Sequence, residues 1–265
     1  MVIGLLVAVA AAFFALERFW PAGPLPSVKG WWARVAILNA AQVGIVILAG
    51  LTWDKWFRGA SLLNLSKHVG DIWAALLTYL VSCLVFYWWH RARHESQLFW
   101  RLCHQLHHSP RRIELLTSFY KHPVEITINS LLTSAIVYPL MGCSVRAAAI
   151  YTVFIAIAEY FYHWNIKTPR WIGWWIQRPE SHRVHHQRSR HSMNYADLPF
   201  IDWIFGTLNN PDRRVPNCGF DPVRESRFVE MLAFRDVNQQ KQPLPPTCFG
   251  CRKRTICHAT NDLNE

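Results

Sequence analysis

The sequence predicts an all-α integral membrane protein, a helical bundle with a helical cap on its cytoplasmic side. Hydrophobic residues make up 51% of the chain and charged residues only 17%, whereas soluble domains carry about 25% charge. The apolar residues are gathered into runs of roughly 20, the length that a helix needs to cross a bilayer. Lysine and arginine give a net charge of +11 and lie just beyond these runs. The basicity therefore indicates a membrane surface and not nucleic acid.

Five apolar runs are the predicted membrane spans. They cover residues 2–19, 33–53, 72–89, 126–141 and 145–162. The first run has no positive residue before it, and its charges, Glu17 and Arg18, come at its end. This order favours a retained helix over a cleaved signal peptide. Only residues 142–144 separate the last two runs, which predicts a tight helical hairpin whose first arm is short enough to be tilted or re-entrant.

The distribution of basic residues predicts the topology. Segment 90–125 follows the third predicted span and carries six of them: Arg91, Arg93, Arg101, Arg111, Arg112 and Lys121. Because basic loops stay in the cytoplasm, the N-terminus is expected outside, and the chain after residue 162 returns to the cytoplasmic side. We therefore expect a multi-pass protein of a bacterial inner membrane or of the endoplasmic reticulum, with its functional site on the cytoplasmic face.

Two further segments carry local predictions. Trp171, Ile172, Trp174 and Trp175 lie between basic residues, a pattern typical of a segment in the lipid headgroup layer. The C-terminal residues Cys248, Cys251, Cys257 and His258 begin with zinc-like spacing but follow a proline-rich polar stretch. A structural zinc site and a flexible tail of reduced thiols both stay open there, and we favour the tail. Seven cysteines without a regular framework argue against a disulfide scaffold.

Most of the 13 histidines fall into three histidine boxes. Residues three or four apart lie on one face of a helix, so each box is expected to form a platform of imidazoles. Imidazole suits iron, zinc, copper and nickel. The boxes are His90 with His94, His104 with His107 and His108, and His182 with His185 and His186.

The number of imidazoles narrows the kind of metal site. Eight exceed the four ligands of a tetrahedral zinc, and two metals fit the number better. A zinc peptidase would have Glu directly after the first histidine, where this chain has Arg91. Soluble carboxylate di-iron bundles need Glu-x-x-His on two helices, and the chain contains no such motif. A dinuclear site with nitrogen ligands remains.

With these motifs the sequence resembles the fatty acid hydroxylase/sterol desaturase superfamily. Its pattern of His-x-x-x-His, His-x-x-His-His and, much later, His-x-x-His-His occurs here in that order. Residues 121–125, 162–165, 194–195 and 202–207 are also similar to the family, and the resemblance covers roughly residues 90–207. It implies transmembrane helices in residues 1–71, a catalytic domain in residues 72–210 and a polar C-terminal tail in residues 211–265.

The resemblance implies a set of site residues. The metal ligands would be the eight box histidines with His163 and, as a ligand or a neighbour of one, His122. His191 is a weaker candidate, and His68 and His258 are expected to lie apart from the metals. We also assign Glu159 and Asn194 to the catalytic site. Glu159 comes four residues before His163 on the same helix face and could orient an imidazole, although a lone acid at a span end is equally compatible. Asn194 and Asp202 are expected to cap or brace the loop beneath the site.

The chemistry implied by the resemblance is oxygen-dependent. Two irons held by the boxes would use dioxygen and electrons to hydroxylate or desaturate a lipid, such as a fatty acyl chain or a sterol. The chain carries no flavin or dinucleotide fingerprint, so we expect an external electron donor of the cytochrome b5, ferredoxin or reductase type. Two alternatives stay open, a non-catalytic metal-binding membrane protein and a metal transporter. The transporter is less favoured because the spans hold few ionisable residues.

One structural prediction follows from the box spacing. In one straight helix His94 and His104 would lie about 15 Å apart along the axis, too far for one compact centre. We therefore expect a bend between Glu95 and Cys103.

Overall fold

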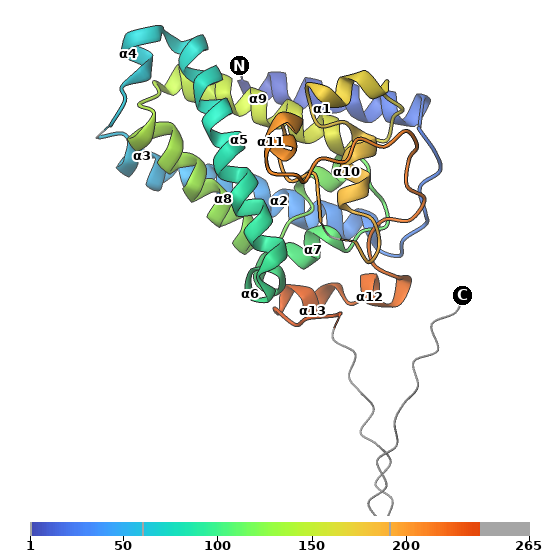
Figure 1. The fold of residues 1–265 in the computed structure, drawn as a ribbon. Coiled ribbons are helices and arrows are strands. Elements are labelled where there is room, and N and C mark those ends of the chain that lie inside the picture. Colours follow the sequence, from blue (N-terminus) through green and yellow to red (C-terminus); the bar gives the residue numbers. More distant parts are fainter. Residues whose placement is uncertain (1, 60, 191, 239–265) are drawn as a thin grey trace, which may run out of the picture.

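The structure, a computed structural model, describes residues 2–59, 61–190 and 192–238. The regular secondary structure of this part of the chain is helical apart from one isolated β-bridge between Gln187 and Cys218 (Figure 1). The all-α prediction is therefore confirmed. The elements are α1 (Val2–Phe19), α2 (Trp31–Leu51), α3 (Trp53–Phe57), α4 (Leu65–Val69), α5 (Asp71–Glu95), α6 (Gln97–Phe99), η1 (Trp100–His104), α7 (Gln105–His108), η2 (Leu115–Phe119), α8 (Pro123–Ala135), η3 (Ile136–Leu140), α9 (Val145–His163), η4 (Arg170–Trp174), α10 (Pro179–His185), α11 (Pro199–Ile204), α12 (Pro222–Ser226) and α13 (Phe228–Leu232).

Three helical stretches among the described residues are long and apolar enough to cross a membrane. They are Trp31–Phe57, Asp71–Glu95 and Val145–His163, and they contain the second, third and fifth predicted spans. The fourth predicted span is divided, because α8 passes into the π-helix η3, which contains Pro139. The first predicted span forms α1 with the expected bounds. The total of five crossings stays a prediction.

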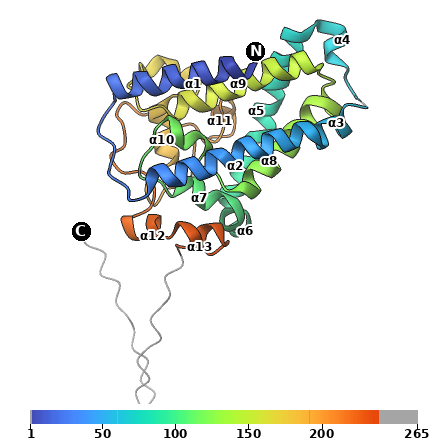
Figure 2. The ribbon, with the colours of Figure 1, turned by 180° about the vertical axis from the view of Figure 1, so that it is seen from behind.

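The long helices form two pairs joined by α5. Helix α1 lies along α9, α2 lies along α8, and α5 crosses from the α4 end to the α6 end (Figures 1 and 2). Small residues on the facing sides, fully buried Ala74, Ala75 and Ala147, bring α5 and α9 close together, as is common between membrane helices. Tyr151 also shares a hydrogen bond with Ser82 across this contact, at 3.1 Å.

The predicted bend after the first box is confirmed. Helix α5 ends at Glu95, and Ser96 is extended with φ −99° and ψ 116°. The Ser96 hydroxyl accepts a hydrogen bond from the Phe99 amide, so it caps the short helix α6, which passes into the π-helix η1. π-Turns are rare and concentrate at functional sites, and this one delivers His104 to the interior.

The C-terminal segment is more than a polar tail up to Asn238. Helices α12 and α13 lie beside α6 and α7 (Figures 1 and 2). Phe220 and Met231 are buried in one cluster with Trp31 and Tyr120, so residues 211–238 close the end of the bundle that carries the histidines. The possible zinc residues Cys248, Cys251, Cys257 and His258 lie outside the described residues.

Candidate metal centre

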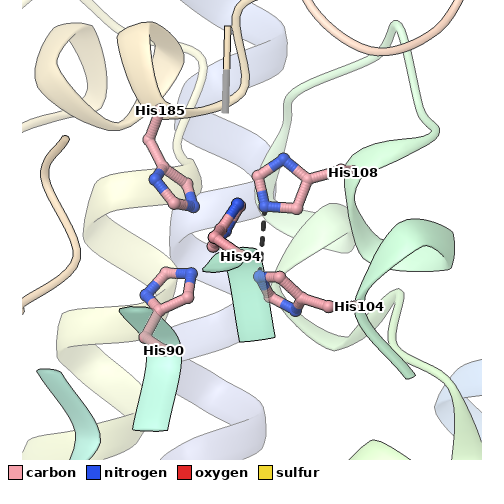
Figure 3. A group of neighbouring side chains, drawn as sticks. All are labelled: His90, His94, His104, His108 and His185. Carbon is pink, nitrogen blue, oxygen red and sulfur yellow. Dashed lines mark hydrogen bonds between the residues drawn. The ribbon is translucent and has the colours of Figure 1, made fainter. Parts of the chain in front are cut away.

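Nine histidines converge in two groups. Within each group, one nitrogen per ring lies within 4.8 Å of the corresponding nitrogens of the others. The first group comes from α5, η1, α7 and α10, with its rings pointing toward a common centre (Figure 3); it consists of His90, His94, His104, His108 and His185. The second group consists of His107, His163, His182 and His186. The rings of His108 and His186 stack at 4.2 Å between centroids, so the two groups are neighbours.

The second and third boxes each contribute to both groups. His104 and His108, four residues apart, belong to the first group, whereas His107 belongs to the second. The third box reverses this order, since His182 and His186 belong to the second group and His185 to the first. The expectation that each box forms a single platform was therefore wrong for these two boxes. A helix turns by about 100° per residue. The rings at positions i+3 and i+4 therefore lie on opposite sides of the ring at position i, and only one of them joins it in the same group.

Hydrogen bonds at the outer ring nitrogens determine which nitrogen faces inward. Carbonyl and carboxylate oxygens only accept, so each imidazole Nδ1 bonded to one carries the proton. Such bonds fix the tautomer and ring orientation of metal-binding histidines. Four Nδ1 atoms donate to backbone carbonyls at 2.8 to 3.3 Å: His90 to Tyr195 O, His185 to Met193 O, His107 to Tyr120 O and His163 to Glu159 O. The fifth, Nδ1 of His104, lies 3.2 Å from the Glu125 carboxylate. In these five rings Nε2 is therefore the nitrogen that carries the lone pair.

The inward nitrogens face one another at distances that suit a bound cation. His182 Nε2 lies 3.1 Å from both His163 Nε2 and His186 Nε2. One ring nitrogen is either a donor or an acceptor, and His163 can only accept at Nε2, so His182 cannot satisfy both neighbours by hydrogen bonds. His90 Nε2 is also buried without a hydrogen-bond partner. Buried polar atoms are rarely left unsatisfied, so the residues present fit a metal in each group.

The imidazoles outside the spanning helices are held neutral, which is the form that binds metals. Burial lowers their pKa values well below the ordinary 6.5, and nearby positive charge or protonated neighbours would lower them further. This holds for His104, His107, His108, His182 and His186.

Glu125 is a site residue whose role sequence reasoning missed. It is fully buried, and its carboxylate pairs with the Arg93 guanidinium and with Nδ1 of His104. Arg93 lies between His90 and His94 of the first box, and His104 belongs to the second box. The Glu125 carboxylate therefore contacts residues of both boxes. The only signal was the family-like segment 121–125, which ends in this glutamate.

Glu159 holds an imidazole, but not with its carboxylate. The backbone carbonyl of Glu159 accepts the proton of His163 Nδ1 at 3.0 Å, whereas its carboxylate pairs with Lys121 Nζ at 2.5 Å. The expected carboxylate–imidazole contact is therefore replaced by a backbone contact, because the Glu159 side chain pairs with Lys121.

Asn194 contacts the histidine groups only through another residue, Gln177. The side-chain amide of Asn194 donates to Ser181 O and Asn209 O. Its backbone carbonyl accepts from Gln177 Nε2, which also contacts His182 Nδ1 at 3.3 Å. The expected bracing role is thus seen. Asp202 braces the same loop by accepting from the amides of Tyr195 and Ala196 at 2.8 and 2.9 Å.

His122 is not brought to either group. Its Nδ1 accepts from the Val124 amide and caps the start of α8, while Nε2 contacts Leu232 O at 3.2 Å. His68 lies in α4, at the other end of α5 from the boxes, in agreement with the expectation. His191 and His258 lie outside the described residues.

A cavity of about 280 Å³ lies beside the two histidine groups. It is lined by His90, His107 and His163, and extends between α2, α5, α8 and α9. Its wall also includes the apolar side chains of Val46, Phe86, Val137 and Ile155, among polar ones. The centre therefore meets an internal space among the spanning helices.

In the part of the chain that the structure describes, fold and site together define an all-helical protein with candidate membrane spans and a paired, nine-histidine candidate metal centre. The profile of the fatty acid hydroxylase family matches residues 75–207. The chain belongs to this family, which confirms the resemblance drawn from the boxes.

Several curated proteins are similar to the chain. It is 29% identical to a very-long-chain aldehyde decarbonylase of Oryza sativa subsp. japonica, over 58% of this chain and 24% of that protein. It is also 29% identical to an alkylglycerol monooxygenase of Homo sapiens, over 52% of this chain and 33% of that protein. A Delta(7)-sterol-C5(6)-desaturase of Nicotiana tabacum is 23% identical over 72% of this chain and 71% of its own length. The chain thus corresponds to a quarter to a third of the first two relatives. No solved structure matches it significantly.

Proposed function

We propose that the chain is a membrane-bound di-iron oxidoreductase that uses dioxygen and external electrons to hydroxylate or desaturate a lipid. The observation that carries the proposal is the pair of histidine groups with Nδ1 protons held by carbonyl or carboxylate oxygens and Nε2 lone pairs turned inward. The names of the similar proteins, which include a monooxygenase and a desaturase, support the reaction class.

The ligands would be divided between the two irons as the structure groups them. Five histidines would hold one iron and four the other, with His108 and His186 stacked between them. Nitrogen-ligated ferrous iron with open positions supplies the capacity to bind and reduce dioxygen. The protein's contribution is to fix the rings, keep them neutral and exclude bulk water from a buried centre.

The cavity among the spanning helices would place the substrate. It carries apolar side chains such as Val46 and Ile155, and its end at the histidine groups is lined by His90, His107 and His163. A lipid chain entering from the bilayer would therefore bring a C–H bond to the face of both groups. Tyr162, Glu159 and Lys121 line the same end and would orient any polar group that the lipid carries.

The test of the reaction is incorporation of labelled oxygen. The iron-loaded protein is incubated with a chemical reductant, ¹⁸O₂ and the lipid extract of its host, and the lipids are analysed by mass spectrometry. We expect lipids that gain one ¹⁸O atom or lose two hydrogens, and neither change with His107→Ala. His68→Ala is the matched control and should retain the reaction. Reductant-driven transport of metal across vesicles without any lipid change would instead favour the transporter alternative.

A further inference from the structure

A second cavity, of about 400 Å³, reaches the metal centre at the C-terminal end of α5. Its wall includes the ligand His94, the indole of Trp100 and residues of α12 and the preceding loop. Helices α6, α7, α12 and α13 lie together at this end of the molecule (Figures 1 and 2). The two cavities thus approach the same centre from different surroundings, one among the spans and one beyond them.

Trp100 lies between this second cavity and the ligands. Its ring centroid is 5.5 Å from that of His94 and 5.4 Å from that of His108. Both rings belong to the five-histidine group. The π-helix η1, which begins at Trp100, places this indole so that one side lines the cavity and the other contacts the imidazoles. An aromatic ring in this position shortens the path of an electron from the cavity to the centre.

The charge of the cavity wall is positive and held in place. Arg188 and Arg224 line it, with Asp221 as the acidic residue, so two positive charges minus one negative leave +1. Arg188 donates to the carbonyl of Phe220 at 3.2 Å, and Arg224 pairs with Asp221 at 2.9 Å. Arg101, which follows Trp100, and Arg190 are exposed next to the lining residues. Such a surface attracts an acidic partner and guides its approach.

We propose that the second cavity is the docking site of an acidic one-electron carrier protein and that Trp100 passes the electron to the histidine groups. The proposal rests on the proposed function, which needs electrons from outside the chain. In each encounter the carrier loses one electron and one iron gains it, with no transfer of atoms. Electron-transfer partners use small, polar interfaces, which agrees with a local basic pocket. A lipid substrate is better served by the cavity among the spans, where Val46, Phe86, Val137 and Ile155 line the wall.

The docking is tested by a binding measurement that needs no metal. Oxidised plant-type ferredoxin, an acidic carrier, is titrated onto the detergent-solubilised protein at low ionic strength. Replacing two steering charges in Arg188→Gln, Arg224→Gln should weaken binding by about tenfold, and added salt should weaken wild-type binding. The control is Arg146→Gln, an exposed arginine at the start of α9 and the other end of the bundle, which should bind as the wild type does.

Three results would overturn the docking site. They are wild-type affinity of the double variant, an equal loss in Arg146→Gln, and a difference between variants that disappears when the micelles contain phosphatidylglycerol. The last result would assign the arginines to a lipid headgroup. If the protein bound no iron but the carrier still distinguished the variants, the proposed function would fail and the docking site would stand.

The role of Trp100 is tested separately on the iron-loaded protein. Trp100→Leu should bind ferredoxin normally but oxidise reduced ferredoxin several-fold more slowly, followed by its visible absorbance in a rapid-mixing instrument. Trp100→Phe, which retains a ring, should recover part of the rate. Reduction by methyl viologen, a small cation that needs no docking site, should proceed equally in all three proteins. Ferredoxin oxidation at the wild-type rate in Trp100→Leu would contradict the electron path.

Discussion

Glu125 and Glu159 show how single side chains differ in their effect on the centre. The Glu125 carboxylate is fully buried and contacts both Arg93 and the Nδ1 proton of His104. The Glu159 carboxylate pairs with Lys121, and only its backbone contacts a ligand. A change of side chain at the two positions therefore has different consequences, although both are acids beside a histidine.

Glu125→Gln should weaken iron binding by roughly 10-fold to 100-fold, the usual effect of removing the partner of a metal-binding histidine. The amide no longer offers two equivalent acceptors to Arg93 and His104. Glu159→Gln is the matched control and should affect iron binding much less, since His163 keeps its backbone acceptor. Competitive titration with a chelator measures both affinities, and equal losses would show that the carboxylate of Glu159 also orients a ligand.

His122→Ala should leave the iron content unchanged and lower the free energy of unfolding by about 1 kcal/mol, the usual effect of losing a side-chain helix cap. The reason is that its Nδ1 caps α8 and neither nitrogen reaches a histidine group. The variant His122→Asn should restore the stability, because Asn also caps helices well. Metal analysis and thermal unfolding decide between this role and the ligand role that the sequence suggested, and loss of iron would support the latter.

The stability of the metal-free protein should fall with acid. An imidazole in the unfolded chain titrates near 6.5, whereas burial lowers the pKa of His104 and His182 well below that value in the folded protein. Between the folded-state and unfolded-state pKa values the unfolded chain binds more protons than the folded protein. The contribution of the neutral imidazoles to the free energy of unfolding is therefore present above about pH 6.5 and is lost as the pH falls below it. Urea unfolding of the apoprotein between pH 8 and 5 measures this, and a midpoint that did not change would contradict the neutral assignment.

At the scale of elements, helical periodicity predicted the boxes but not their division. Rings three and four apart were expected to share one platform, and the bend between Glu95 and Cys103 was deduced because distant boxes must meet. The π-helix η1 could not be deduced, because a single widened turn has no periodic signal in five residues. The division of each later box between two groups depends on how α7 and α10 are docked, which only long-range packing determines.

Helix η4 and the residue after it expose three tryptophans. Trp171, Trp174 and Trp175 are 65%, 55% and 73% exposed, as expected for side chains that meet lipid headgroups and not a protein core. Replacing all three with Ser should reduce quenching of tryptophan fluorescence by brominated lipids and leave the iron content unchanged. If the variant lost its iron while quenching was unaffected, η4 would belong to the support of the centre and not to the membrane interface.

At the scale of the whole molecule, the return of the chain to one end of the bundle builds the centre. His94 and His185 are 91 residues apart in sequence (185 − 94), yet their rings lie 4.7 Å apart. This meeting was predicted from the topology, since α8 and α9 leave and return. The packing of α12 and α13 over the same end was not predicted, because short amphipathic helices after the last box leave no membrane-length signal.

The metal content of the purified protein tests the central claim most directly. Protein quantified by amino-acid analysis and metals quantified by mass spectrometry should give two irons per chain. The double variant His185→Ala, His186→Ala removes one ligand from each group and should lose most of both irons while its helical circular dichroism is retained. One iron or none in the wild type, or two irons in the double variant, would contradict a di-iron centre built from these nine histidines.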